Sequence, residues 1–373
     1  MTCDTNVDPV VASLLFQHAS RPKREDFSSH VLNIATDIGL GVVYEIRTND
    51  EFDIGRRQVQ QAWGIDELTV STHHLRFHCI VFEDEDDDKV APLIYVRVLS
   101  RNPVILKCSD SNNPGVETTL FRDSGDVLLN HGDILQLASD ISLIFQTNRC
   151  GKLPTSGLDD IRQAEVRRFA AQYQVTGRML GAGGNASVFV AVKQSSHRQV
   201  ACKIVSLPCK RRDQPQIDQR LQVAEAEALE LRLMRKRENL AREYNVLKDL
   251  NHPNIICLEQ VFCASYNIYI FQELITGGDL LSYIEREGAL GEPQTAVIVR
   301  QVLKATDYLH SNLIVHRDIK PENVLMTSWR EGGRIVLTDF GQARTLEGAK
   351  TAAKSSAVFR MQSVVGTYGY TAP

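Results

Sequence analysis

A glycine-rich run between two strand-like segments is the first part of the sequence with an evident chemical use. It comprises Leu180, Gly181, Ala182, Gly183, Gly184, Asn185, Ala186, Ser187 and Val188. Glycine lets backbone amides approach phosphate oxygens closely and permits the φ values of a tight turn. Phosphate binding and a purely structural hairpin therefore both fit. A Rossmann dinucleotide site fits less well, because Ala186 replaces the third glycine and a strand follows instead of a helix.

Three further motifs follow the glycine-rich run. They are Val200-Ala201-Cys202-Lys203 on the next predicted strand, His316-Arg317-Asp318-Ile319-Lys320-Pro321-Glu322-Asn323 after a predicted helix, and Leu337-Thr338-Asp339-Phe340-Gly341. Any one of them could be a surface ion pair or a turn, but four motifs in this order are specific. From about Tyr173 to Pro373 the sequence resembles the serine/threonine type of eukaryotic protein kinases.

This resemblance implies ATP as a cofactor and gives roles to four charged residues. Lys203 is expected to hold the α- and β-phosphates, paired with Glu243 on the following helix. Asp318 is expected to accept or orient the proton of the attacking hydroxyl. Lys320 is expected to stabilise the transferring phosphoryl group, a role typical of kinases that act on serine and threonine.

The same resemblance implies a metal site and an adenine pocket. Asn323 and Asp339 are expected to hold two Mg²⁺ ions, since hard cations prefer carboxylate and amide oxygens. The residues expected to bind the rest of the nucleotide are Val188, Ala201, Glu273, Ile275, Asp279 and Leu325. Four residues are expected to form a packed column that links the two lobes: Leu247, Leu258, His316 and Phe340.

The resemblance also bears on substrates and regulation. Asp279 and Glu322 occupy positions where kinases that prefer basic residues upstream of the target serine or threonine carry acids. Arg317 is expected to pair with a phosphate on the activation loop. The candidate phosphorylation sites on that loop are Thr345, Thr351, Ser355, Ser356 and Ser363.

Two features depart from most kinases. Lys203 and Glu243 are 40 positions apart, and a periodic apolar pattern from Pro215 to Leu231 predicts an extra amphipathic helix between them. This helix is either an extension resting on the small lobe or a docking helix for a partner. The sequence also stops at Pro373, before the helices that complete a large lobe, so we expect a C-terminally incomplete kinase domain with an exposed apolar surface and uncertain activity.

The region from about Val42 to Gln146 has a different texture. Its β-branched, aromatic and aliphatic runs are Val42–Ile46, Leu75–Phe82, Leu93–Leu99, Val104–Lys107, Val127–Leu129, Ile134–Leu137 and Ile141–Phe145. Turn residues such as those of 112–115 and 130–133 separate the runs. Many short strands at close spacing predict an all-β sandwich or barrel. A Gly/Pro/Ser-rich break at 151–157 predicts a linker, and Asp159–Tyr173 reads as a helix with acids first and arginines late.

Polar residues in the loops of this β region resemble the forkhead-associated (FHA) domain, a sandwich that binds phosphothreonine peptides. By this resemblance Arg56 and Ser71 contact the phosphate, Thr72 assists, and Asn102 holds the peptide backbone. His74 is expected to brace the loop from inside the fold. An FHA domain followed by such a kinase resembles the checkpoint and meiotic kinases of the calmodulin-kinase branch.

Composition excludes several classes. With 42 Lys+Arg against 46 Asp+Glu in 373 residues the net charge is −4, which argues against nucleic acid as a direct partner. No apolar stretch is long enough for a membrane span, and the N-terminus lacks the order of a secretory signal. The eight scattered cysteines indicate reduced thiols. We expect a nuclear protein, with the cytoplasm as the alternative.

The sequence therefore predicts a multidomain chain: an N-terminal extension (1–40), an all-β FHA sandwich (41–146), a linker with a short helix (147–172), and an α+β kinase-like domain with a small lobe and an incomplete large lobe (173–373). The expected function is an ATP- and Mg²⁺-dependent serine/threonine kinase of checkpoint or meiotic signalling. The expected partners are a phosphothreonine protein, protein substrates and, as an open alternative, a second copy in a dimer. The rival function is an inactive phosphopeptide-binding protein.

Overall fold

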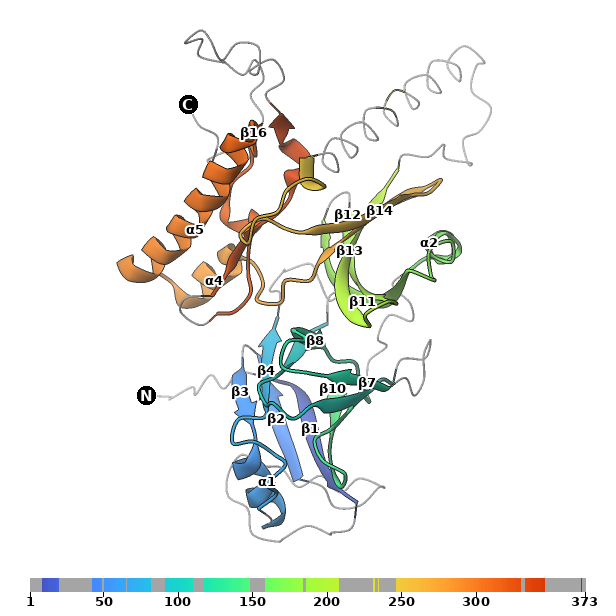
Figure 1. Cartoon of the computed structure of the whole chain (residues 1–373), viewed down its shortest axis with the longest axis vertical. Coiled ribbons are helices and arrows are strands. Elements are labelled where there is room, and N and C mark those ends of the chain that lie inside the picture. The colour runs from blue at the N-terminus through green and yellow to red at the C-terminus, as the bar shows by residue number, and fades with distance from the viewer. Residues whose placement is uncertain are drawn as a thin grey trace, which may run out of the picture. The chain divides into compact units, whose positions relative to one another are not determined.

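The computed structural model describes residues 9–19, 42–48, 50–64, 66–81, 91–109, 117–147, 158–183, 186–207, 231, 234, 246–329, 333–345 and 370. The chain divides into two compact units. One comprises Met1–Gly157 with Ser195–Gln199, and the other comprises Leu158–Gln194 with Val200–Pro373. Figure 1 shows both units and labels many of their helices and strands.

The first unit is built mainly from β-strands. Its elements are β1 (Val10–His18), β2 (Val42–Arg47), β3 (Glu51–Ile54), α1 (Arg56–Trp63), β4 (Leu75–Ile80), β5 (Leu93–Val98), β6 (Val104–Lys107), β7 (Glu117–Leu120), β8 (Asp126–Leu128), β9 (Ile134–Gln136) and β10 (Ile141–Thr147). A six-stranded sheet has the order β2-β1-β10-β9-β6-β7, and a four-stranded sheet has the order β3-β4-β5-β8. All of these strand pairs are antiparallel.

One hydrophobic core joins the two sheets into a sandwich. Leu143 and Phe145 of β10 and Leu75 and Phe77 of β4 are fully buried in the same cluster. Buried and partly exposed residues alternate along β10, as expected for a strand with one face on a core and the other toward solvent. The prediction of a largely β N-terminal region is confirmed, and every predicted strand-like run overlaps a strand.

Strand β1 differs from the prediction, which sets residues 1–40 apart from the sandwich. Ala12 through Phe16 are buried, and Leu14 pairs with Tyr44 of β2 on one side and Phe145 of β10 on the other. The apolar run of β1 has no alternation, so its periodicity does not identify a strand. Its partner β10 lies far along the chain and is not evident from local sequence.

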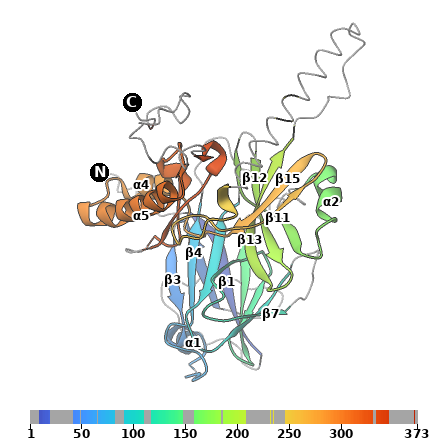
Figure 2. The same cartoon turned by 45° about the horizontal axis from the view of Figure 1, so that its top comes forward.

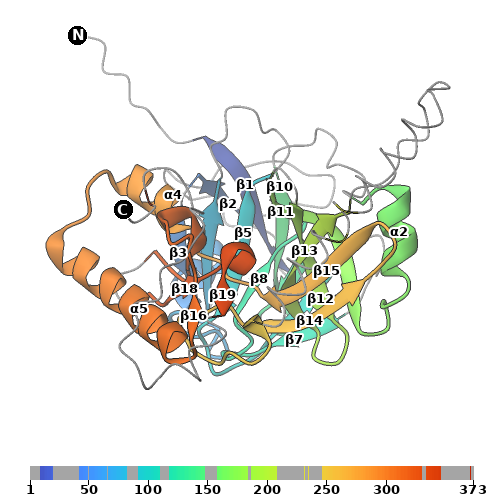
Figure 3. The same cartoon turned by 90° about the horizontal axis from the view of Figure 1, so that it is seen from above.

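The second unit begins with α2 (Asp160–Val166) and a five-stranded sheet. The strands are β11 (Tyr173–Gly183), β12 (Ala186–Lys193), β13 (Arg198–Ser206), β14 (Leu258–Cys263) and β15 (Asn267–Glu273), in the order β11-β12-β13-β15-β14. The elements that follow are α4 (Leu280–Glu287), α5 (Glu292–Ser311), β16 (Ile314–Val315), the 3₁₀ turn η1 (Pro321–Asn323), β17 (Val324–Met326), β18 (Ile335–Leu337), η2 (Phe340–Gln342) and β19 (Arg344–Thr345). Helix α2 lies beside the five-stranded sheet in Figures 2 and 3.

A separate core holds the helices and the short strands of this unit together. It contains Leu280 and Tyr283 of α4, Ala305 and Leu309 of α5, and all three residues of β18. Strands β17 and β18 pair antiparallel, as do β16 and β19. The loops that follow β16 and β18 therefore start from strands that are paired and packed on this core. Within the described ranges, no helix has both the length and the apolar character needed to cross a membrane.

Of the two helices predicted outside the kinase motifs, the structure describes the one after Asp159 and not the one from Pro215. Helix α2 starts as expected, with the Asp159 carboxylate accepting a hydrogen bond from the Arg162 amide at 2.7 Å, but it ends at Val166 and turns lead into β11. The predicted extra helix from Pro215 lies outside the described residues apart from Leu231. The predicted domain ranges stay predictions.

Candidate functional site

Lys203 lies on β13 of the five-stranded sheet, which corresponds to the predicted small lobe. Its side chain is on the face of the sheet that is turned away from the main core of this lobe. Val200, Cys202 and Ile204 are fully buried in a core that also contains Tyr269 of β15. Because side chains alternate along a strand, Ala201 and Lys203 face the opposite side of the sheet. The Lys203 side chain is one-fifth exposed there. The sheet therefore presents one ammonium group on its second face.

The partner of Lys203 on that face comes from the segment after β18. Lys203 Nζ donates a hydrogen bond to Asp339 Oδ1 at 3.2 Å. Asp339 has a left-handed backbone with a φ of 58°, a conformation that only a few per cent of residues other than glycine adopt. The five-stranded sheet and the β17–β18 pair therefore meet at one site. The residue expected to bind the ATP phosphates, Lys203, is in direct contact with Asp339, which is expected to hold Mg²⁺.

Asp318, Lys320 and Asn323 form a second cluster. Asn323 Nδ2 donates to the Asp318 carbonyl oxygen at 2.8 Å and to Asp318 Oδ2 at 3.0 Å. Lys320 Nζ lies 3.7 Å from the same Oδ2. The Asp318 side chain is only 12% exposed, so its carboxylate is held in one orientation by an amide and an ammonium group. A fixed carboxylate of this kind can accept a proton from a hydroxyl group.

His316 connects this cluster to the Asp339 segment. Its Nδ1 accepts a hydrogen bond from the Asp318 amide at 3.3 Å, and its Nε2 lies 3.0 Å from the Thr338 carbonyl oxygen. Burial lowers the pKa of His316 below its usual value, which favours the neutral ring with its proton on Nε2. The ring also contacts Phe340 edge-on, with centroids 4.6 Å apart. Phe340 in turn shares a core with Leu247 and Leu258.

The β17–β18 pair brings Asn323 and Asp339 to the same end of two strands. Val324 pairs with Leu337, and the Thr338 amide donates to the Asn323 carbonyl oxygen at 2.9 Å. Because Asp318 engages the Asn323 amide nitrogen, the amide oxygen is the atom left to bind a cation. The half-exposed Asp339 carboxylate supplies a second hard oxygen. These donors fit Mg²⁺, which binds to few protein ligands and completes its shell with water and phosphate.

Among the described residues there is no group of three or more His, Cys, Asp and Glu side chains that could hold a metal ion. The Asn323 and Asp339 pair is smaller than such a group and contains an amide. Carboxylate and amide oxygens of this kind are ligands that a hard cation can share with water and phosphate.

The described residues of the glycine-rich run lie at the end of β11 and the start of β12. Gly181 pairs with Val188, Ala182 with Ser187, and Gly183 with Ala186. A Cβ atom on Gly181 would meet nothing within 4 Å, so this glycine is not required by packing against another element. Gly184 and Asn185 lie outside the described residues, as does Glu243.

Glu273, expected at the adenine pocket, ends β15 and is engaged through its side chain. Its Oε1 accepts from the Cys257 amide at 3.0 Å, and its Oε2 accepts from Arg334 Nη2 at 2.8 Å. Arg334 also donates to the Pro253 carbonyl oxygen at 2.7 Å. Sequence reasoning missed Arg334, because a lone arginine before a short strand gives no local signal of this contact.

The remaining pocket residues lie close to β17. Asp279 forms a bridge with Leu325, and the Asp279 carboxylate caps α4 by accepting from the Ser282 amide at 2.9 Å. Ile275 and Leu325 are partly buried against the large-lobe core. Val188 has the same strand parity as Ala186, which packs on the second face of the sheet with Ile270. The nucleotide roles of these residues stay predictions.

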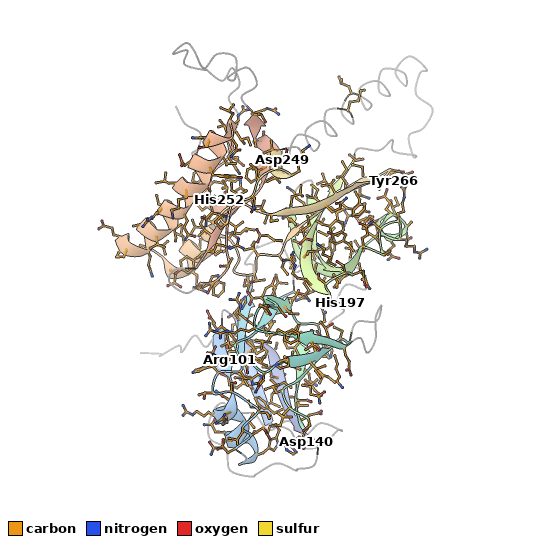
Figure 4. The ribbon with its side chains drawn as sticks, viewed as in Figure 1. Arg101, Asp140, His197, Asp249, His252 and Tyr266 are labelled. Atoms are coloured by element: carbon orange, nitrogen blue, oxygen red, sulfur yellow. The ribbon has the colours of Figure 1, made fainter. Side chains whose placement is uncertain are left out.

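In the first unit, hydrogen bonds connect the loops that carry Arg56, Ser71 and Asn102. Arg56 Nε donates to the Val70 carbonyl oxygen at 3.0 Å. Ser71 Oγ and Ser100 Oγ are 2.8 Å apart. Asn102 Nδ2 donates to the Thr69 carbonyl oxygen, and the backbone N–H of Asn102 donates to Ser100 Oγ at 2.9 Å. Arg101, in the same loop, is labelled in Figure 4.

His74 braces this loop cluster from inside the sandwich, as the sequence predicts. It is fully buried, and its Nδ1 accepts from the Ser71 amide at 3.0 Å. Burial lowers the pKa of His74 to about 4, so the ring is neutral at pH 7. Thr72, next to Ser71, is exposed. Three polar side chains and one guanidinium group thus lie on loops fixed by a neutral histidine.

Comparison with known proteins agrees with the kinase-like motifs. Residues 174–373 match the protein kinase domain family. The chain is 30% identical over 334 residues to the meiosis-specific serine/threonine-protein kinase mek1 of Schizosaccharomyces pombe, covering 89% of this chain and 62% of that protein. It is 30% identical over 335 residues to MEK1 of Saccharomyces cerevisiae, covering 86% of this chain and 58% of that protein.

A third relative is the serine/threonine-protein kinase cds1 of Schizosaccharomyces pombe, 26% identical over 279 residues, covering 74% of this chain and 53% of that protein. The chain thus spans about 60% of the length of the meiotic relatives it matches. The family match covers more than half of the chain, and it includes Lys203, Asp318, Asn323 and Asp339. The chain belongs to the protein kinase family.

Proposed function

We propose that this chain is an ATP- and Mg²⁺-dependent serine/threonine kinase that is recruited through phosphothreonine. The contact of 3.2 Å between Lys203 and Asp339, beside the Asp318–Asn323 cluster, is the observation that carries the catalytic part. It unites an ammonium group, a base and hard oxygen donors, which are the groups that phosphoryl transfer requires.

Each residue of the site has a distinct task. The Lys203 ammonium binds the oxygens of the ATP phosphates, and Asp318 accepts the proton of the substrate hydroxyl. Lys320, 3.7 Å from the Asp318 carboxylate, stabilises negative charge on the transferring group. Asn323 and Asp339 hold Mg²⁺, which when bound neutralises charge on the phosphates. His316 keeps Asp318 and the Asp339 segment in register through its two ring nitrogens.

A transfer assay with the whole chain tests the catalytic part. We expect ATP- and Mg²⁺-dependent phosphorylation of a serine or threonine peptide, and Asp318→Asn should lower the rate by roughly 10²-fold or more. Asp307→Asn, at an exposed position of α5, is the matched control. Equal rates for the chain and Asp318→Asn contradict the proposal. Such a result favours the rival function, a non-catalytic phosphopeptide-binding protein.

Recruitment through phosphothreonine is supported by the sandwich and its FHA-like loops. The Arg56 side chain is one-third exposed, and the Arg56 backbone amide donates to the Ser71 carbonyl oxygen at 2.9 Å. A guanidinium group can bind phosphate in a bidentate manner, and a serine hydroxyl can add one bond. Asn102, on the neighbouring loop, can hold the peptide backbone. The alignment with mek1 is longer than the kinase match, so the likeness extends into this unit.

Paired peptides that differ only in the phosphate test this recruitment. The chain should bind the phosphothreonine peptides of a degenerate library and not their threonine counterparts. Arg56→Ala should weaken binding at least tenfold, because a charge-assisted pair is lost. Arg57→Ala is the matched control, since Arg57 is the next residue and is exposed. Equal binding of both peptide forms contradicts the proposal.

The names of the relatives support a signalling role for the chain. Two carry meiosis-specific in their names and are serine/threonine kinases. We therefore propose a nuclear role in meiotic or DNA-damage checkpoint signalling, with substrates that carry basic residues upstream of the target. A peptide array in which arginine is moved along the upstream positions tests the preference. Microscopy of the tagged chain in meiotic and vegetative cells tests the location, and exclusion from nuclei contradicts it.

A further inference from the structure

The segment before the kinase match packs on the back of the small-lobe sheet. Leu158, Phe169 and Tyr173 are buried in one cluster with Cys202 and Tyr269. The family match begins only at residue 174. The chain therefore adds its own cover to the face of the sheet opposite Lys203.

Aromatic contacts define how this cover is seated. The Phe169 ring stacks on Phe262 with centroids 4.6 Å apart and contacts Tyr269 at 5.0 Å and Phe271 at 5.6 Å. Tyr173 stacks on Phe271 at 4.2 Å. Aromatic pairs of this kind contribute beyond their buried area and fix orientation. Helix α2 and the turns after it are therefore held in one position on β14 and β15.

Glu165 of α2 is the polar anchor of this contact. It is only 6% exposed and accepts three hydrogen bonds, from the Tyr266 amide at 2.8 Å, Asn267 Nδ2 at 2.8 Å and Tyr269 Oη at 2.9 Å. Figure 4 labels Tyr266 at this end of the sheet. A buried carboxylate is tolerated only when donors satisfy it, and its removal leaves those donors unpaired. All three donors belong to β15 or the residue before it.

The strand that Glu165 holds is the neighbour of the strand that carries Lys203. Tyr269 pairs with Ile204, and Ile270 pairs with Lys203. Arg162 of α2 also reaches β13, with Nη2 3.3 Å from Ser206 Oγ. Helix α2 is thus hydrogen-bonded to both strands. In β15 the bonded residue Tyr269 is next to Ile270, which pairs with Lys203, and in β13 the bonded residue Ser206 is three residues from Lys203.

We propose that Glu165 is a positioning residue for nucleotide binding. By fixing β15 from the back of the sheet, it sets the position of Lys203 on the front. The inference rests on the proposed function, because it takes Lys203 as the residue that binds the ATP phosphates. It makes the segment 158–173 a working part of the kinase unit and gives it a role beyond that of a linker.

The test measures the KM for ATP, the KM for a peptide substrate and kcat, for the 373-residue chain and its variants. All are measured at a temperature where thermal melting curves show that each protein is folded. We expect Glu165→Ala to raise the KM for ATP about tenfold while the KM for peptide stays unchanged. Glu165→Gln should recover part of the loss, since its amide oxygen still accepts hydrogen bonds. Asp160→Asn, at an exposed position of the same helix, is the control. An unchanged KM for ATP in folded Glu165→Ala overturns the proposal.

Two additions keep the outcome clear. Tyr269→Phe removes one of the three donors without removing the carboxylate, so it serves if Glu165→Ala does not fold, and about a threefold rise in the KM for ATP is expected. Calorimetric titration with ATP and Mg²⁺ separates the two proposals. If the unchanged chain binds no nucleotide, both fail. If the chain and the Glu165 variants bind equally well, only the positioning role fails.

Discussion

Lys203 Nζ and Asp339 Oδ1 lie 3.2 Å apart although 136 positions separate the two residues in the chain. The pair is accessible, with side chains 20% and 49% exposed. An ion pair with this much solvent contact contributes at most about 1 kcal/mol to folding. The pair therefore matters more for placing the ammonium group beside the carboxylate than for the stability of the fold. A mutation that removes the ammonium group can test these two contributions separately.

The first prediction concerns Lys203→Met. We expect kcat/KM for phosphoryl transfer to fall by roughly 10²-fold or more, because an ammonium group that binds the phosphates is lost. The melting temperature should change by less than about 3 °C, since little stability depends on the pair. Lys304→Met, at an exposed position of α5, controls for loss of a lysine. A large drop in melting temperature with Lys203→Met contradicts this assignment of roles.

A second prediction concerns the pH dependence of the first unit. His74 has a pKa lowered to about 4, against about 6.5 in an unfolded chain, so the unfolded state binds more protons between these values. Stability should then fall as the pH falls from about 6.5 toward about 4. Urea unfolding of a Trp329→Phe variant, followed by Trp63 fluorescence, measures this unit alone, because the chain has two tryptophans.

The matched variant for this experiment is His74→Gln, which does not titrate. We expect a lower urea midpoint at pH 7, because the Ser71 amide loses a well-placed acceptor, and a weaker dependence on pH. The midpoint should be compared, and not the fluorescence amplitude, since the His18 ring packs against Trp63 at a tilt, with centroids 5.5 Å apart, and can quench its fluorescence. Equal pH dependence in the two proteins would show that other groups control acid stability.

A third prediction concerns Gly55→Ala. A Cβ at this position would overlap the Thr72 carbonyl oxygen, so the backbone of the 71–72 loop must shift. We expect a loss of about 1–3 kcal/mol in unfolding free energy and weaker phosphopeptide binding. Urea unfolding and peptide titration measure the two effects. Gly181→Ala, where a Cβ meets nothing within 4 Å, should leave stability nearly unchanged.

The fourth prediction concerns the pair of Glu273 and Arg334. Arg334→Met, Glu273→Gln and the double variant form a cycle that should give a coupling energy of about 1–2 kcal/mol, since Glu273 is mostly buried and both groups are fully engaged. The exposed cross-strand pair Lys107–Glu117, at 3.0 Å, should give about 0.5 kcal/mol or less. Equal coupling in the two cycles would mean that burial adds nothing here.

Several features could be predicted from the sequence because they depend on local pattern or on motif order. Short runs of β-branched, aromatic and aliphatic residues such as Leu75–Phe82 predict strands, and the strand β4 (Leu75–Ile80) is present there. The charged motifs predict that Lys203, Asp318 and Asp339 serve one site, and Lys203 and Asp339 are in contact. The family match to residues 174–373 agrees with the same motifs.

Other features could not be predicted, for physical reasons. Strand β1 is a continuous apolar run, whose period does not distinguish a buried strand from other buried segments. The bonds of Glu165 and Arg334 join residues about 60 to 100 positions apart and leave no trace in local composition. A buried glutamate in a polar helix reads as a surface residue until its three donors are seen. These contacts require the folded chain.

The position of β1 has a consequence for synthesis on the ribosome. This strand is made early but lies between β2 and β10 in its sheet, and β10 ends at Thr147. The edge of β1 that binds β10 therefore stays unpaired until nearly the whole unit has left the ribosome. An unpaired strand edge can pair with other nascent chains and cause aggregation. An expression product that starts at residue 41 would lack β1 and leave β2 and β10 without their shared neighbour, so it should be insoluble.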